Sequence, residues 1–228
     1  MSLKETIEKE SKKKLTVKQT ILGWTVLILV GLSVYSACSS DTTETTTKTT
    51  EEVTQANEDA TKSKDIYTEG AKLTEEKDIA LFNFNAWKTR VDLIKKSVVS
   101  HWDLYWTQTF NGISQGKIDQ YKAYDNLSQL TKLLEQYQKD FREIGEDEHI
   151  YDGIKGEQLD KLKQAEEDYS TSVYTMKTAC KKAKEMFDNG EYKPSTFEKI
   201  KKDVDMAIGF IAKAESEVNE VEKALSQK

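Results

Sequence analysis

The chain has 228 residues, of which 32% are charged, and it contains one proline and two cysteines. Its formal net charge is −6, and because residues 1–37 hold six lysines and three glutamates, the remainder carries −9. An acidic chain of this kind lacks the clustered Lys and Arg that a phosphate backbone requires, so no nucleic-acid partner is expected.

The N-terminal stretch has the pattern of an export signal. A basic cluster at residues 12–14 precedes an uncharged apolar run from Ile21 to Ala37, and Cys38 follows directly. Lysines beside an apolar segment stay on the cytoplasmic side of a bacterial membrane, and small residues before a cut are typical of a cleavage site. Everything after residue 38 is therefore predicted to be extracytoplasmic.

The end of this stretch resembles the cleavage region of bacterial lipoprotein precursors. Tyr35, Ser36 and Ala37 form the flank, in which Ser36 and Ala37 are the small residues required just before the modified cysteine. The resemblance implies that residues 1–37 are a signal peptide and that Cys38 carries a covalent lipid, which anchors the chain because buried acyl chains bind membrane lipid. In the alternative, residues 21–37 remain as an uncleaved single-pass anchor, although a full span needs about 20 apolar residues.

The residues after the anchor divide into a tether and a body. Residues 38–50 are rich in Ser and Thr and too poor in apolar side chains to form a core, so they are predicted to be disordered. From residue 51 the apolar residues recur at helical spacing. Helices are predicted at about 53–67, 73–112, 117–144 and 156–188, and from Pro194 to the C-terminus.

These helices predict an all-α fold. The apolar stripes alternate three- and four-residue steps, which is the spacing of helix-on-helix packing in coiled coils and bundles. The expected architecture is therefore an elongated antiparallel bundle of three to four long helices over residues 51–228. Ser195 and Glu198 are predicted to form a capping box at the start of the last helix.

The aromatic-rich helix at 73–112 carries a second apolar side. Phe82, Leu93 and Leu104 fall nearly opposite the main stripe, eleven residues apart. A helix that is apolar on two sides either lies centrally in its bundle, here covered by the 53–67 helix, or presents one side to a partner. We call these three residues the ridge and keep both interpretations open.

Four other features are assigned structural roles. His101 is expected to be a satisfied core or boundary histidine, and Glu166 to lie at a rim or to pair with Arg90, His101 or a lysine. Cys180 lies on the apolar stripe and is expected to be a buried, unreactive thiol. The acidic loop at 146–157 lacks oxygen ligands at the required positions of a calcium loop, so no metal is expected.

No catalytic motif or cofactor fingerprint is present, so an enzyme is not expected. The leading interpretation is a lipid-anchored bacterial surface protein whose helical bundle binds another protein. The alternative is a single-span membrane component of an envelope apparatus, of the secretion or conjugation type, with its N-terminus in the cytoplasm.

Overall fold

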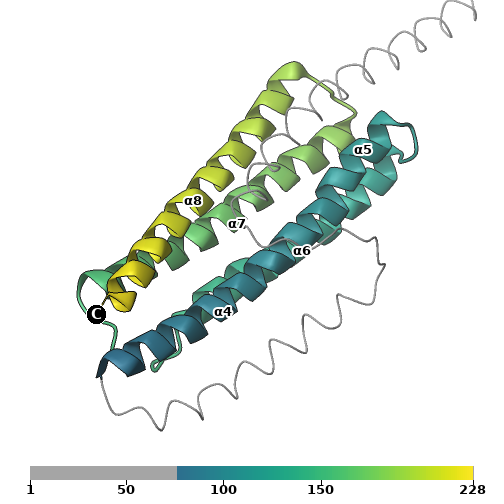
Figure 1. Ribbon diagram of the computed structural model, residues 1–228. Coiled ribbons are helices and arrows are strands. Elements are labelled where there is room, and N and C mark those ends of the chain that lie inside the picture. The colour runs from purple at the N-terminus through teal and green to yellow at the C-terminus, as the bar shows by residue number, and fades with distance from the viewer. Residues whose placement is uncertain (1–75, 228) are drawn as a thin grey trace, which may run out of the picture. The chain divides into compact units, whose positions relative to one another are not determined.

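The computed structural model describes residues 76–227, and this part of the chain is all-α, with no strand (Figure 1). The helices pack against one another, which confirms the predicted all-α bundle. The export signal, Cys38, the tether and the helix predicted at 53–67 lie outside the described residues. The elements are α4 (Glu76–Trp102), the π-helix η2 (Asp103–Thr107), α5 (Gln108–Ser114), α6 (Gln120–Ile144), α7 (Glu157–Asn189) and α8 (Pro194–Ser226).

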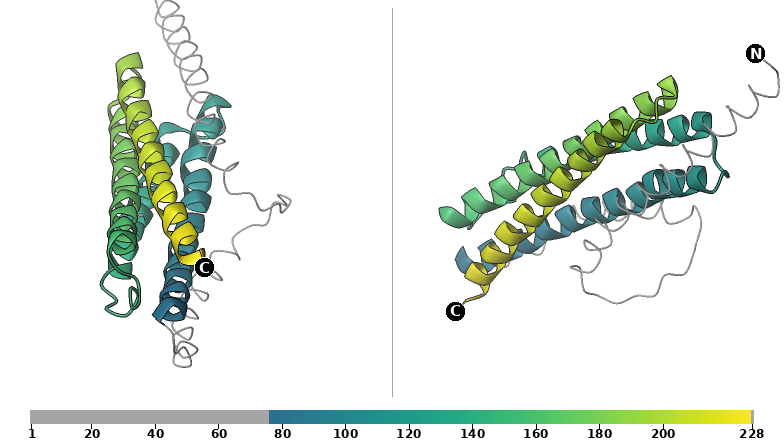
Figure 2. Two further views of the ribbon diagram at one scale, coloured as in Figure 1. Left: turned by 60° about the vertical axis from the view of Figure 1, so that its left-hand side comes forward. Right: turned by 90° about the horizontal axis from the view of Figure 1, so that it is seen from above.

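The described residues form two compact units, and each of the four long helices contributes to both. Unit 1 comprises His101–Leu134 and Thr175–Ile208. Unit 2 comprises residues 76–100, Glu135–Tyr174 and residues 209–227. Within each unit the helical stretches lie side by side (Figures 1 and 2). Each unit has its own apolar core.

The core of unit 1 is built on an aromatic stack that begins at the end of α4. The rings of Trp102 and Trp106 stack with centroids 4.5 Å apart, and Trp106 lies 4.8 Å from Phe110. Phe110 in turn contacts Phe187 of α7, with ring centroids 5.7 Å apart. All four rings are almost fully buried, so this stack fixes the end of α4, η2 and α5 against α7.

The π-helix η2 determines which aromatic side chains enter this stack. Continued three-four spacing predicts Trp102, Tyr105 and Thr109 on the buried side. A π-helical turn accommodates an extra residue, and here Trp106 is 1% exposed whereas Tyr105 is half-buried. The prediction for Tyr105 is therefore wrong: its ring stacks on His101 at the boundary of the core, with centroids 6.1 Å apart.

Several other core residues of unit 1 lie on the predicted stripes. Helix α6 contributes Leu127, Leu130 and Leu134, each of which has no exposed surface. Cys180 of α7 is also fully enclosed, and burial raises the pKa of its thiol. The predicted buried state of Cys180 is thus confirmed.

Helix α8 begins two residues earlier than the capping-box pattern indicates. Pro194 is the first helical residue, a position that suits proline because its fixed φ matches the helix and its missing N–H would have no helical partner. Ser195 therefore lies inside the first turn, and its side chain forms no hydrogen bond to a described residue. The backbone N–H groups of Thr196 and Phe197 instead donate to the Lys193 carbonyl, so the predicted box is wrong.

Unit 2 has a core of large apolar side chains from all four helices. Phe84 and Trp87 of α4 stack with ring centroids 6.2 Å apart, and Phe141 of α6 stacks on Tyr169 of α7 at 5.4 Å. The loop between α6 and α7 adds Ile150, which has no exposed surface. Each of these rings is almost completely removed from water, so each contributes to the unit's apolar stabilisation.

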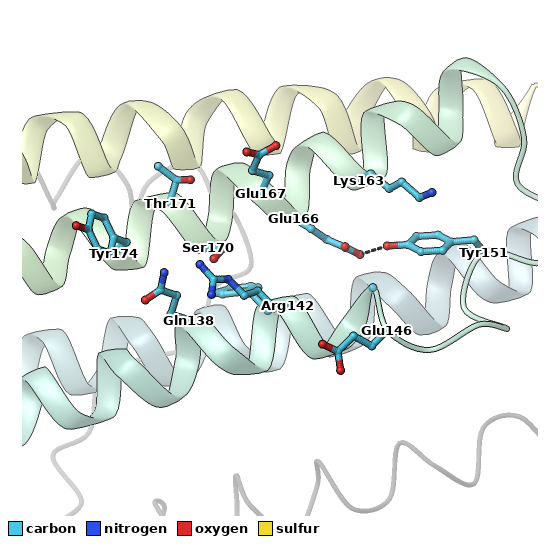
Figure 3. A pocket seen from close by; sticks show the side chains of 12 residues that line it. Gln138, Arg142, Glu146, Tyr151, Lys163, Glu166, Glu167, Ser170, Thr171 and Tyr174 are labelled. Atoms are coloured by element: carbon cyan, nitrogen blue, oxygen red, sulfur yellow. Dashed lines mark hydrogen bonds between the residues drawn. The ribbon is translucent and has the colours of Figure 1, made fainter.

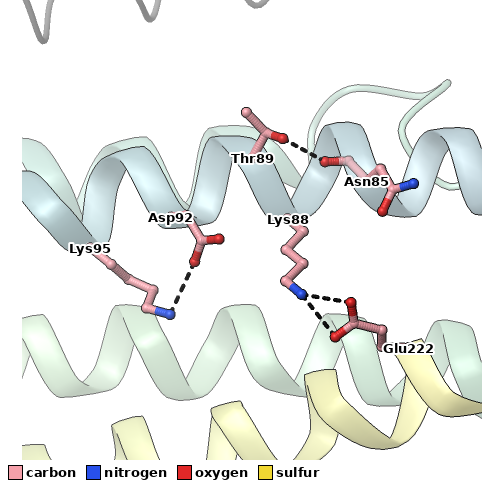
Figure 4. Close-up of polar contacts among 6 residues, drawn as sticks. All are labelled: Asn85, Lys88, Thr89, Asp92, Lys95 and Glu222. Atoms are coloured by element: carbon pink, nitrogen blue, oxygen red, sulfur yellow. Dashed lines mark hydrogen bonds and ion pairs between the residues drawn. The ribbon is translucent and has the colours of Figure 1, made fainter. Parts of the chain in front are cut away.

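Ion pairs at the boundary of unit 2 align its helices. Lys88 of α4 contacts both carboxylate oxygens of Glu222 of α8 at 2.8 Å (Figure 4). Lys95 of α4 pairs with Glu215 of α8. These groups are partly exposed, so each pair contributes at most about 1 kcal/mol. They favour one register of α8 on α4 more than they stabilise the fold.

Among the described residues, none of the helices combines the length and the apolar character that a bilayer span requires.

Candidate functional site

The residues predicted to carry the anchor, Cys38 and its flank Tyr35, Ser36 and Ala37, lie outside the described residues. Their roles therefore stay predictions, as does the covalent lipid.

The ridge residues differ in exposure. Phe82 and Leu93 belong to unit 2 and are half-buried. Leu104 belongs to unit 1 and is 42% exposed, because it lies on the outer side of η2. Neither half-buried residue is part of the core. A partner surface at the ridge therefore stays a prediction.

Unit 2 has a groove between the end of α6 and the first half of α7 (Figure 3). Its volume is about 680 Å³. The residues that define its chemistry are Arg142, Tyr151, Lys163, Glu166, Ser170 and Tyr174. Sequence analysis singled out Glu166 alone of these, because a charged residue stands at an apolar position of the α7 stripe.

Glu166 is held by two hydrogen bonds to the same oxygen. The indole Nε1 of Trp87 and the hydroxyl of Tyr151 both donate to Oε1 of Glu166. Glu166 is half-buried, as the predicted rim position requires, and its hydrogen bonds come from two neutral donors. Of the basic partners considered in the alternative, Arg90 instead pairs with Asp147 at 3.0 Å.

Burial controls the protonation of this cluster. Burial raises the pKa of the Glu166 carboxyl above its ordinary value, and the hydrogen bonds from Tyr151 and Trp87 oppose the rise. Burial and the adjacent Glu166 carboxylate also raise the pKa of the Tyr151 hydroxyl. Tyr151 therefore keeps its proton at neutral pH and serves as a hydrogen-bond donor rather than a nucleophile.

A glycine at the end of α6 makes room for this carboxylate. A Cβ at Gly145 would lie 2.6 Å from Oε2 of Glu166 and 3.3 Å from the Tyr151 hydroxyl. Gly145 is not in the left-handed region of φ, so the backbone conformation does not require glycine there. Glycine is required because the Glu166 carboxylate occupies the space that a side chain would take.

The loop that carries Tyr151 is tied to α4. The Asn83 side chain donates to the Asp152 carbonyl at 2.9 Å. Gly153 adopts φ of 81°, and a Cβ there would lie 2.7 Å from the backbone nitrogen of Ala80. Only glycine combines that φ with so close an approach. Gly153 thus allows the loop backbone to lie directly on α4, and this position brings Tyr151 to Glu166.

The groove also offers hydrogen-bond donors that no described residue uses. Arg142 is exposed, forms no ion pair or hydrogen bond with a described residue, and points from α6 toward Ser170 of α7 (Figure 3). Lys163 has its ammonium 5.7 Å from the centre of the Tyr151 ring, a cation–π contact, and forms no ion pair within the described range.

The acidic loop itself does not assemble a metal centre. His149 pairs with Asp152 at 3.1 Å on the exposed surface. Within residues 76–227, no group of three or more His, Cys, Asp or Glu side chains is arranged to hold a metal ion.

No family model matches this chain, and no curated protein or solved structure matches it.

Proposed function

We propose that this chain is a bacterial lipoprotein, anchored at Cys38 on the extracytoplasmic face of the cell membrane, whose helical bundle binds another protein without catalysing a reaction. The observation that carries the proposal is the order of residues at the N-terminus: a basic cluster, an uncharged apolar run, small residues and a cysteine. Lipid on Cys38 gives that cysteine a function that a spanning segment would not require.

The described part of the chain supports a binding role. Its fold is a helical bundle with exposed large apolar side chains, among them Leu104 at 42% and Val99 at 43%. Exposed aromatic and aliphatic side chains are the usual anchors of protein interfaces. Leu104 is also a ridge residue, which makes it the first position to test for partner contact.

The alternative is a single-span component of an envelope apparatus that retains residues 1–37. Intact mass measured on chain extracted from bacterial membranes separates the two. A lipoprotein begins at Cys38 and carries the added mass of acyl chains, and Cys38→Ser abolishes both the processing and the added mass. A mass equal to the unmodified chain with residues 1–37 would refute lipidation at Cys38.

The partner surface can be tested by site-specific photocrosslinking in the native membrane. A photoreactive residue at position 104 is expected to give a discrete adduct with one protein. The matched control at position 121, which is more exposed, should give no such band if the ridge provides the contact. Equal adducts at both positions would contradict a partner surface at the ridge.

A further inference from the structure

The groove between α6 and α7 has a fixed acceptor on one wall. Oε1 of Glu166 receives both hydrogen bonds from Trp87 and Tyr151. Oε2 receives none from the part of the chain that the structure describes, and it is not among the buried side-chain atoms that lack a partner. Since Glu166 lines the groove, Oε2 is an acceptor that remains open to it, on a carboxylate whose orientation the other two bonds determine.

The same groove has charged donors. Arg142 lines it without an ion pair to any described residue, and its guanidinium can donate two parallel hydrogen bonds. Lys163 adds an ammonium near the Tyr151 end, and Ser170, which is 6% exposed, adds a hydroxyl between them. Figure 3 shows these groups arrayed along the length of the groove, with Arg142 between Glu166 and Tyr174.

The balance of charge in the groove selects the class of ligand. Two cations, Arg142 and Lys163, face three carboxylates, Glu146, Glu166 and Glu167. A compact anion would be repelled by the carboxylates, and a compact cation would be repelled by the guanidinium and the ammonium. Each repulsion costs free energy of binding. A neutral ligand avoids both repulsions. It can bind both the cations and the carboxylates if its adjacent groups each donate and accept hydrogen bonds.

Sugar hydroxyls have this property, because each one donates one hydrogen bond and accepts up to two. Hydrogen bonds from hydroxyls to ionised side chains are roughly twice as strong as those between neutral groups. The exposed ring of Tyr174, 53% accessible at one end of the groove, offers a flat apolar surface for the C–H face of a sugar. We propose that the groove binds a neutral oligosaccharide, with Arg142 and Glu166 Oε2 contacting adjacent hydroxyls and Tyr174 stacking on the ring. This assignment does not depend on the lipid anchor or on a protein partner.

Titration calorimetry on the full-length chain tests the assignment. The chain is kept in a detergent without a sugar headgroup, and the probes are cellohexaose, maltohexaose and chitohexaose. At least one probe is expected to bind with a dissociation constant of about 1 mM or tighter. Absence of heat from all three at about 10 mM would overturn the proposal, as would saturable binding of spermidine or citrate at this groove in place of a sugar.

Two variants locate the binding. Arg142→Ala is expected to weaken binding by about tenfold, and the fold should survive because Arg142 has no partner among the described residues. Lys132→Ala is the control: it removes the same charge from an exposed position of the same helix that does not line the groove. If Arg142→Ala fails to fold, Tyr174→Ala serves in its place, with a similar loss expected. Binding unchanged by the groove variant, or equally weakened by Lys132→Ala, would overturn the proposal.

Discussion

The carboxylate of Glu166 occupies the space that a side chain at Gly145 would need. A Cβ at position 145 would lie 2.6 Å from Oε2, while Oε1 is held in place by Trp87 and Tyr151. The end of α6 and the first half of α7 therefore fit together at one point, where the Glu166 carboxylate lies against Gly145. This relationship fixes the wall of the groove and leads to the first two predictions.

Gly145→Ala is expected to destabilise the chain by about 1–2 kcal/mol, because the carboxylate can move only by giving up hydrogen bonds from two donors. Chemical denaturation measures the change in the free energy of unfolding. Gly209→Ala is the matched control: position 209 lies inside α8 with nothing within 4 Å of an added Cβ, so alanine should stabilise by about 0.5–1 kcal/mol.

A double-mutant cycle tests the cause of this loss. In a Glu166→Ala background the clash is absent, and Gly145→Ala should no longer destabilise. The same penalty in both backgrounds would show that Glu166 is not the reason for glycine at position 145.

The stability of the chain is expected to depend on pH through Glu166. Its folded-state pKa is raised above the ordinary value of 4.5 by burial, so the folded chain holds this proton more tightly than the unfolded chain does. The stabilising contribution is complete below pH 4.5 and is lost as pH rises through the folded-state pKa. Relative to Glu166→Gln, which cannot titrate, the wild type should therefore lose stability as pH rises above 4.5, until the pH has passed the folded-state pKa of Glu166.

Denaturant unfolding at several pH values measures that difference. Subtracting the Glu166→Gln curve removes the contributions of the other carboxyls with raised pKa values, Asp140 and Glu217. A difference that does not change with pH would contradict a raised pKa at Glu166.

The π-helix η2 predicts unequal costs for two adjacent aromatic residues. Trp106→Ala should destabilise unit 1 by about 3–5 kcal/mol, because it empties a fully buried site between Trp102 and Phe110. Tyr105→Ala should cost about 1 kcal/mol, since that ring is half-buried at the boundary. Thermal and denaturant unfolding of the two variants makes the comparison. A larger loss for Tyr105→Ala would indicate a continuous α-helix in place of η2.

Cys180 is expected to resist thiol reagents until the chain unfolds. It is fully enclosed, and burial raises its pKa, so the reactive thiolate is scarce. The measurement uses Cys38→Ser, which leaves Cys180 as the single thiol of the sequence. Reaction with an aromatic disulfide should be slow in buffer and fast in denaturant. Rapid labelling of the native chain would contradict the enclosed position.

Apolar periodicity in the sequence is enough to predict which residues of several helices are buried. Leu127, Leu130 and Leu134 recur at three- and four-residue steps, which predicts a core position, and all three are fully buried. The position of Cys180 followed from the same rule. Periodicity succeeds here because a helix repeats every 3.6 residues, so a run of apolar side chains at three-four steps specifies which side of the helix leaves water.

The same rule fails where the backbone departs from a regular helix or where two local signals compete. It placed Tyr105 rather than Trp106 inside, because no residue type marks a π-helical turn in one sequence. The capping-box pattern placed Ser195 at the N-cap. Proline is equally favoured at the first helical position, however, and the helix begins at Pro194.

By itself, then, the sequence determined the all-α class and most of the buried stripes, since these depend on residue order over short distances. It also predicts an anchor at Cys38. Tertiary structure alone decided that Glu166 accepts from Trp87 and Tyr151, that Gly145 yields space to its carboxylate, and that Arg142 faces a groove. The physical reason is that a stripe specifies which side of a helix is buried but not which residues of another helix lie opposite. Trp87 and Glu166 are 79 positions apart in the chain, and only the packing of α4 against α7 brings them into contact.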